Sequence, residues 1–160
     1  MGGFVIRQAR AADALAIFAV LRANAHDGQL MLVPLDRIRK GVEEYKVASV
    51  DGAIVGCCAL HDHGKGIYEL CSLSVLKEFQ AGGIGTGLAR ESLGSVGARS
   101  LVFLGTDKPG FYEGLGFRPM KPNRLPIGIW LGKTRNLLQQ DLREWPKIFS
   151  TRYTFMEHAD

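Results

Sequence analysis

The segment from Gln80 to Thr86 has residue types and spacing that suit the binding of an anion. Its glycines come between a β-rich stretch and a stretch with helical periodicity. Such a junction lets several backbone N–H groups converge on a phosphate, and the positive end of the helix dipole adds attraction. A tight turn that needs positive φ angles for structural reasons alone is the alternative. We expect these residues to contact the phosphates of a ligand: Gln80, Ala81, Gly82, Gly83, Ile84, Gly85 and Thr86.

Two common phosphate-binding motifs do not fit this turn. A Walker loop places Lys and then Ser or Thr after its last glycine, whereas Gly85 is followed by Thr86 and Gly87. A dinucleotide fingerprint that starts at Gly83 needs a glycine where the chain has Leu88. The turn therefore predicts neither a P-loop nor a Rossmann domain.

Glu69 is a candidate proton acceptor in the β-rich stretch that precedes the turn. Strict alternation along a strand would place these residues on one face: Ile67, Glu69, Cys71, Leu73 and Val75. A carboxylate among apolar neighbours binds a proton more readily, which suits a general base for an amine. An ion-paired or solvent-exposed glutamate is the alternative.

The elements that must position these residues follow from periodicity and turn signals. Strands are predicted at Phe4–Ala9, Tyr45–Val50, Ala53–His61, Ile67–Leu76, Ser100–Leu104, from Phe117 and at Ile148–Met156. Helices are predicted from Asp13, as N-cap, to Ala23, from Pro34 through Val42, from the glycine turn to near Gly97, and at Pro109–Gly114 and Arg135–Trp145. Asp51-Gly52 predicts a hairpin. In the first helix, Leu15, Phe18, Ala19 and Arg22 share one face.

Composition restricts the class of protein further. The chain has 160 residues, 46% hydrophobic and 22% charged, which predicts one soluble domain over residues 1–160, without a membrane span or secretory signal, in the cytoplasm. Three cysteines in strand-like segments predict reduced core thiols, and their spacing with histidine predicts no metal site. The net charge of +4 favours acidic ligands, but no Lys/Arg block indicates nucleic acid.

Three motifs in order resemble the GNAT superfamily of acetyltransferases. Ser72–Val75 precedes the turn, Gln80-x-x-Gly83-x-Gly85 fits the family's (Arg/Gln)-x-x-Gly-x-(Gly/Ala) signature, and Phe111–Phe117 follows it. The resemblance implies an α/β (α+β) fold whose mixed, mostly antiparallel sheet is flanked by helices and splayed after the fourth strand. It also implies acetyl-CoA as co-substrate, with backbone contacts from Leu73, Ser74 and Val75.

The same resemblance implies roles for two side chains. Glu69 stands where some family members have their general base, and Tyr112 where the family often has the acid that protonates the departing thiolate. A packing role in the core is the alternative for Tyr112. Direct attack of an amine on acetyl-CoA is implied, with the Leu73 N–H polarising the acetyl carbonyl.

Within the superfamily the chain is more similar to the N-acetylglutamate synthase group, through Val50–Leu60, Tyr68–Val75, Leu125–Trp130 and Trp145–Lys147. This implies an amino acid as acceptor, with glutamate first. Another small amine or a protein lysine remains open, because Pro34-Leu-Asp36 stands where the longer enzymes have Pro-Arg-Ser. A non-catalytic acyl-CoA sensor is a further alternative, and a homodimer is possible.

Overall fold

The computed structural model describes residues 3–25, 32–126, 128–129 and 154–158. Its centre is a seven-stranded sheet in the order β1-β2-β3-β4-β5-β7-β6. The strands are β1 Val5–Gln8, β2 Tyr45–Val50, β3 Ala53–Asp62, β4 Ile67–Val75, β5 Leu101–Thr106, β6 Arg118–Pro119 and β7 Thr154–His158. β4 and β5 are parallel and the other neighbours are antiparallel, so the predicted mixed, mostly antiparallel sheet is confirmed.

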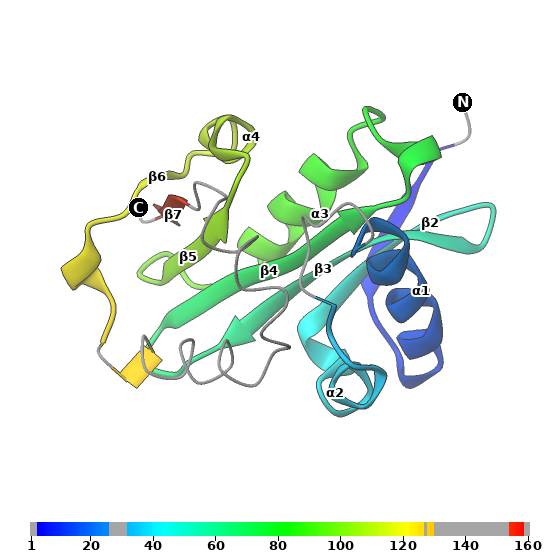
Figure 1. The fold of residues 1–160 in the computed structure, drawn as a ribbon, viewed down its shortest axis with the longest axis horizontal. Coiled ribbons are helices and arrows are strands. Elements are labelled where there is room, and N and C mark those ends of the chain that lie inside the picture. Colours follow the sequence, from blue (N-terminus) through cyan, green and yellow to red (C-terminus); the bar gives the residue numbers. More distant parts are fainter. Residues whose placement is uncertain (1–2, 26–31, 127, 130–153, 159–160) are drawn as a thin grey trace.

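Helices cover both faces of the sheet (Figure 1). They are α1 Ala14–Ala25, α2 Leu35–Lys40, α3 Ile84–Leu93 and α4 Pro109–Glu113, with 3-10 turns at Ala11–Asp13, Val42–Glu44, Lys77–Phe79 and Pro122–Arg124. Adjacent residues of β3 divide between two buried clusters: Cys57 packs with α1 and α2, and Cys58 packs with α3. The cysteine side chains thus point to opposite faces, as alternation predicts.

The fully buried face of α1 differs from the stripe of residues that the sequence placed at helical spacing, of which Phe18 packs partly buried on the core. The helix buries Ala14, Ile17, Val20 and Leu21 against the sheet, and Leu15 of the other stripe is 62% exposed. Both stripes are apolar in this alanine-rich segment, so periodicity alone does not select between them. Asp13 is also not the N-cap: it belongs to the preceding 3-10 turn, where its carboxylate accepts hydrogen bonds from Arg7 and the Arg10 N–H.

The predicted hairpin at Asp51-Gly52 is confirmed. Both residues have positive φ, 49° and 82°, as a two-residue turn between right-twisted strands requires. The second helix ends earlier than predicted, at Lys40, because Gly41 leaves the helical conformation and Val42 enters a 3-10 turn. The helix after the glycine turn likewise ends at Leu93.

The C-terminal predictions are tested in part. The predicted helix at Arg135–Trp145 lies outside the described residues. Of the predicted strand Ile148–Met156, the described part begins at Thr154 and extends as β7 to His158, between β5 and β6. Within the part of the chain that the structure describes, no helix is long and apolar enough to cross a membrane.

Candidate active site

The glycine turn lies at the N-terminal end of α3. Gly83 is the residue before the helix and has a φ of 81°, and Ala81 has a φ of 64°, so two residues of this short turn are left-handed. Alternation of left- and right-handed residues turns successive N–H groups toward one concave side. The first N–H groups of a helix have no intrahelical partner, and the Gly87 N–H donates to the Gly83 carbonyl to begin the ladder. These features fit a phosphate.

The glycines of this segment differ in the space that a Cβ atom would have at each position. A Cβ at Gly83 would meet nothing within 4 Å, and one at Gly85 would meet only ordinary contacts at 3.8 Å. A Cβ at Gly87 would approach Ile6 Cδ1 to 2.9 Å, so this glycine lets β1 pack closely on α3. The positive φ of Gly83 favours glycine there, whereas close packing on β1 requires glycine at position 87.

The sheet opens next to this turn. β4 and β5 pair from Ile67–Leu101 only as far as Glu69–Phe103, although β4 continues to Val75. Beyond that pair β5 leaves toward α4, and β4 continues toward the start of α3 (Figure 1). The expected splay after the fourth strand is therefore present, and it leaves the edge of β4 beyond Glu69 without β5 as a neighbour.

The end of β4 is fixed by side chains from two other segments. Gln80 Nε2 donates to the Val75 carbonyl at 2.9 Å, which links the glycine turn to the strand. Asn24 at the end of α1 donates to the Ser74 hydroxyl at 2.6 Å and to the Val75 carbonyl at 3.1 Å. The hydroxyl of Ser74 thus has a structural role, so a ligand contact from this residue would have to come from its backbone.

A β-bulge at Ser72 corrects the prediction that β4 presents one continuous face. Ser72 has a φ of 53°, and it and Leu73 together oppose the single residue Cys58. Cys71 packs on the α1/α2 face, whereas Leu73 and Val75 pack on the α3 face, so alternation reverses at the bulge. Glu69, before the bulge, shares the face of Cys71 and not that of Leu73.

Buried groups surround the bulge. Cys57 Sγ donates weakly to the Ser72 carbonyl at 3.6 Å, and the Tyr45 hydroxyl hydrogen-bonds the Ser72 side chain. Burial raises the pKa of the Tyr45 phenol and of the Cys58 thiol, each to about 12, and raises the pKa of the Cys57 thiol well above its usual range. All three groups therefore stay protonated at neutral pH. The cysteines are free, as the sequence predicted, and they serve as core residues.

Tyr112 lies on the α3 face of the sheet. Its ring packs edge to face on Phe111 and Phe117, with centroids 4.9 and 5.7 Å apart, and it borders the cluster that contains Val75. Phe111 Cζ is 3.8 Å from the Cβ position of Gly85, so α4 adjoins the glycine turn. The turn, the end of β4 and α4 thus meet on one side of the opening.

Glu69 lies on the other face, at the closed end of the opening. Its Oε2 is 3.2 Å from Nε2 of His63, and the two side chains are 18% and 19% exposed. The ring of His61 packs edge to face on the ring of His63, with centroids 4.7 Å apart. Nδ1 of His61 is 2.8 Å from Glu44 Oε1. The neighbours of Glu69 are therefore partly polar, contrary to the expectation of an apolar setting.

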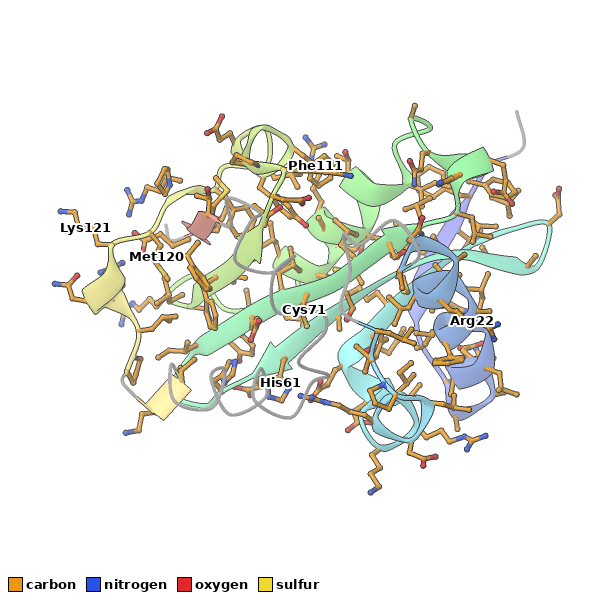
Figure 2. The ribbon with its side chains drawn as sticks, viewed as in Figure 1. Arg22, His61, Cys71, Phe111, Met120 and Lys121 are labelled. Atoms are coloured by element: carbon orange, nitrogen blue, oxygen red, sulfur yellow. The ribbon has the colours of Figure 1, made fainter. Side chains whose placement is uncertain are left out.

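The sequence assigned no role to His61 and His63, because the contacts join β3 to β4 across their turn. The pairing of His61 with Glu69 in the ladder could have been found from the alternation of both strands. In Figure 2, Cys71 on β4 lies between His61 at the lower end of the sheet and Phe111 at the upper edge. His61 and Phe111 thus mark opposite ends of the opening.

A second carboxylate, that of Glu157, lies in the row of paired residues that runs from Glu69 across the sheet. Phe103 pairs with Glu69 on one side and with Glu157 of β7 on the other. Glu157 is buried and accepts hydrogen bonds from Arg118 Nε at 3.3 Å and from Arg124 Nε at 2.9 Å. Two guanidinium groups compensate one carboxylate, so this part of the row carries net positive charge. No group of His, Cys, Asp and Glu suited to a metal ion occurs within the described ranges.

The arrangement separates two kinds of chemistry. Backbone donors and small residues gather on the α3 side, where they fit a phosphorylated thiol ester. Titratable side chains gather on the α1/α2 side, where they can take a proton from an approaching nucleophile. The place where β4 and β5 stop pairing lies between the two groups of residues.

Comparison with known proteins identifies the family of this chain. Residues 42–119 match the model of the acetyltransferase (GNAT) domain. An N-acetyltransferase of Chlorobaculum tepidum is 30% identical over 127 residues, which are 78% of this chain and 82% of that protein. The amino-acid acetyltransferase of Pseudomonas paraeruginosa is 27% identical over 76% of this chain, but the match spans only 29% of that longer enzyme.

A solved structure shares the fold. N-acetylglutamate synthase from Neisseria gonorrhoeae, complexed with coenzyme A and N-acetyl-glutamate, superposes with a TM-score of 0.73 at 21% identity, over 99% of this chain and 35% of that one. The turn that fits a phosphate, the sheet that opens beside it and these matches lead to one conclusion. The chain belongs to the GNAT acetyltransferases and is an acetyl-CoA-dependent N-acetyltransferase.

Proposed function

We propose that this enzyme transfers the acetyl group of acetyl-CoA to the α-amino group of an amino acid, with glutamate as the first candidate. The observation that carries the proposal is the position of Glu69, the last residue of β4 that pairs with β5. Its carboxylate lies at the closed end of the opening, on the face opposite the glycine turn. It is therefore placed to meet an amine that enters from the α1/α2 side.

In the proposed reaction each residue has one task. The N–H groups from Gly82 to Thr86 bind the pyrophosphate of acetyl-CoA, and the Leu73 N–H beside the bulge polarises the acetyl carbonyl. Glu69 takes a proton from the acceptor ammonium group, which leaves a neutral amine that attacks the carbonyl directly. Tyr112, on the α3 face with the glycine turn, donates a proton to the thiolate that departs.

Two observations support an acidic amino acid as acceptor. Relatives that match 76% of this chain are amino-acid acetyltransferases. Arg118 and Arg124 together also outweigh the charge of Glu157, so net positive charge lies across Phe103 from Glu69. A carboxylate on the acceptor would be attracted to that charge, while its ammonium group would be attracted to Glu69.

The proposal is tested by a panel of the twenty amino acids with acetyl-CoA, in which thiol release is measured and products are identified by mass spectrometry. Glutamate should give the highest kcat/KM and an N-acetylated product in equal amount to the CoA released. If only amino acids without an acidic side chain react, the proposed acceptor is wrong. If CoA binds but none of the twenty amino acids causes thiol release, the acceptor is not an amino acid of this panel.

A further inference from the structure

The end of β4 directs backbone groups to the edge that β5 has left. The Leu76 N–H donates to the Val55 carbonyl at 2.9 Å, so Leu76 bonds to β3. In an antiparallel pair, residues that bond to the partner strand alternate with residues whose backbone groups are directed away from it. Val75 precedes Leu76, so its N–H and carbonyl are directed to the other edge. There β4 has no strand as a neighbour, because its last pair with β5 is Glu69 with Phe103.

Asn24, in the last turn of α1, reaches this edge with its side-chain amide. Its Nδ2 donates to the Val75 carbonyl at 3.1 Å and to the Ser74 hydroxyl at 2.6 Å, and it lies 3.4 Å from the Val20 carbonyl. A backbone carbonyl can only accept, so the two carbonyls identify the amide atom that faces them as nitrogen. Oδ1 is the atom that remains, and within the part of the chain that the structure describes it has no hydrogen-bond partner.

The Val75 carbonyl accepts a second side-chain amide. Gln80 Nε2, from the start of the glycine turn, donates to it at 2.9 Å. Two amides, one from α1 and one from the turn, thus bond to the oxygen that a neighbouring strand would bond to in a continuous sheet. A carbonyl oxygen has two lone pairs, so this one has no capacity left for a ligand. A ligand donor at this point of the edge needs another acceptor, and Asn24 Oδ1 is one.

The pantetheine arm of acetyl-CoA is the ligand segment that would pass this point. The arm joins the pyrophosphate, for which we propose the glycine turn, to the thioester, for which we propose the Leu73 N–H. Val75 lies between the turn and Leu73 along β4. The arm carries a hydroxyl and amide N–H groups, and a donor that leaves water without a new acceptor weakens binding. The hydroxyl and the first amide are its polar groups nearest to the pyrophosphate.

We propose that Asn24 is a binding residue for the pantetheine arm of acetyl-CoA. Oδ1 accepts a hydrogen bond from the hydroxyl or the first amide N–H of the arm, while Nδ2 stays bonded to the end of β4. The inference rests on the proposed binding of the pyrophosphate at the glycine turn, and it does not depend on which amine is the acceptor. Because Nδ2 already fixes the side chain, binding of the arm costs little additional side-chain entropy.

The test measures the affinity of Asn24→Leu for two ligands by calorimetry. CoA contains the arm, whereas 3′-phospho-ADP has the same nucleotide and pyrophosphate without it. The variant should fold, because the Val75 carbonyl keeps Gln80 and the Ser74 hydroxyl keeps the Val20 carbonyl, at 3.5 Å, as a partner. Loss of one hydrogen bond should weaken CoA binding about three- to tenfold and change the dissociation constant of 3′-phospho-ADP by less than about twofold.

Two outcomes would overturn the proposal. Equal losses for both ligands would show that Asn24 acts through the glycine turn, and unchanged affinity for both would show that Oδ1 contacts no part of the ligand. Asn24→Ala, which introduces no larger group, repeats the measurement if the leucine variant does not fold.

Two further variants complete the experiment. Gln8→Leu is the matched control, because the Gln8 amide also donates to a backbone carbonyl, that of Tyr45 at 2.7 Å, but on β1 at the edge of the sheet. Both affinities should stay as in wild type. Gly85→Val should weaken both ligands. If it weakens neither while Asn24→Leu still weakens CoA alone, the proposed role of the glycine turn fails and that of Asn24 stands.

Discussion

The two faces of the sheet contribute to the site by different means. On the α3 face, the proposed cofactor contacts come from the backbone N–H groups of one continuous segment, residues 82–86, at the start of α3. On the α1/α2 face, the group around Glu69 is built from side chains of β3, β4 and the turn before β2. The first is encoded locally and the second depends on strand register. Damage to one face should therefore leave the function of the other intact.

The largest effect is expected from Glu69→Gln. This change keeps the shape of the side chain and removes the proton acceptor, so kcat should fall about a hundredfold or more. The KM for acetyl-CoA should stay within about twofold, because the glycine turn is untouched. The defect should shrink at high pH, where more of the amine is already neutral. Initial rates across pH decide this, with Glu91→Gln on the exposed side of α3 as control.

Gly85→Val should weaken CoA binding, the function proposed for the opposite face of the sheet. A Cβ at Gly85 would lie 3.8 Å from Phe111 Cζ and from Val75 Cγ2, so valine would fill the space between the turn, α4 and the end of β4. The Cβ itself meets no backbone atom, so the fold should survive. Loss of hydrogen bonds to a charged phosphate should weaken CoA binding about ten- to a hundredfold, as measured by calorimetry.

The matched control for that variant is Gly87→Val. There a Cβ would approach Ile6 Cδ1 to 2.9 Å, so the expected loss is about 1–3 kcal/mol of unfolding free energy. A folded Gly85→Val protein that binds CoA as tightly as wild type would make the turn purely structural.

Tyr112→Phe should have a smaller effect that sharpens the comparison. The aromatic packing on Phe111 and Phe117 is kept, and only the hydroxyl is lost. We expect kcat to fall about tenfold, because a positioned proton donor no longer assists departure of the thiolate. The decline of the wild-type rate at high pH, as the phenol ionises, should vanish in the variant. Equal rates and equal pH profiles would return Tyr112 to a packing role.

Asp13→Asn should affect neither face of the site. The hydrogen bond from Arg7 lowers the pKa of Asp13, so this pair stabilises the fold above the pH range in which an unfolded carboxyl group titrates. That contribution is lost as pH falls through the lowered pKa of Asp13. The variant should lose about 1 kcal/mol in urea unfolding at pH 7 and less at pH 3, while both KM values stay unchanged. A stability difference that grows at low pH would refute this account.

The sequence was most informative where function depends on one segment. The glycine turn, the Asp51-Gly52 hairpin and the strands around them could be predicted because turn chemistry and alternation act over a few residues. The bulge at Ser72 could not, because a residue other than glycine gives no warning that it will adopt a positive φ. The reversal of β4 at this bulge separates Glu69 from Leu73.

The contacts of His63 with Glu69 and of Glu157 with two arginines were missed for a related reason. They join residues that are close only after the strands have paired in register. The buried face of α1 was misjudged because alanine-rich helices present two apolar stripes. In each case the missing information was tertiary, and it concerned the face where side chains and not the backbone make the site.

The division between the two faces is tested most directly by the double variant Gly85→Val/Glu69→Gln. If the glycine turn serves only CoA binding and Glu69 only proton transfer, the losses in kcat/KM for acetyl-CoA are independent. The account predicts a loss in the double variant equal to the product of the two single losses, within about twofold. A loss no larger than that of Glu69→Gln alone would show that both residues act on one shared step, and would contradict the account.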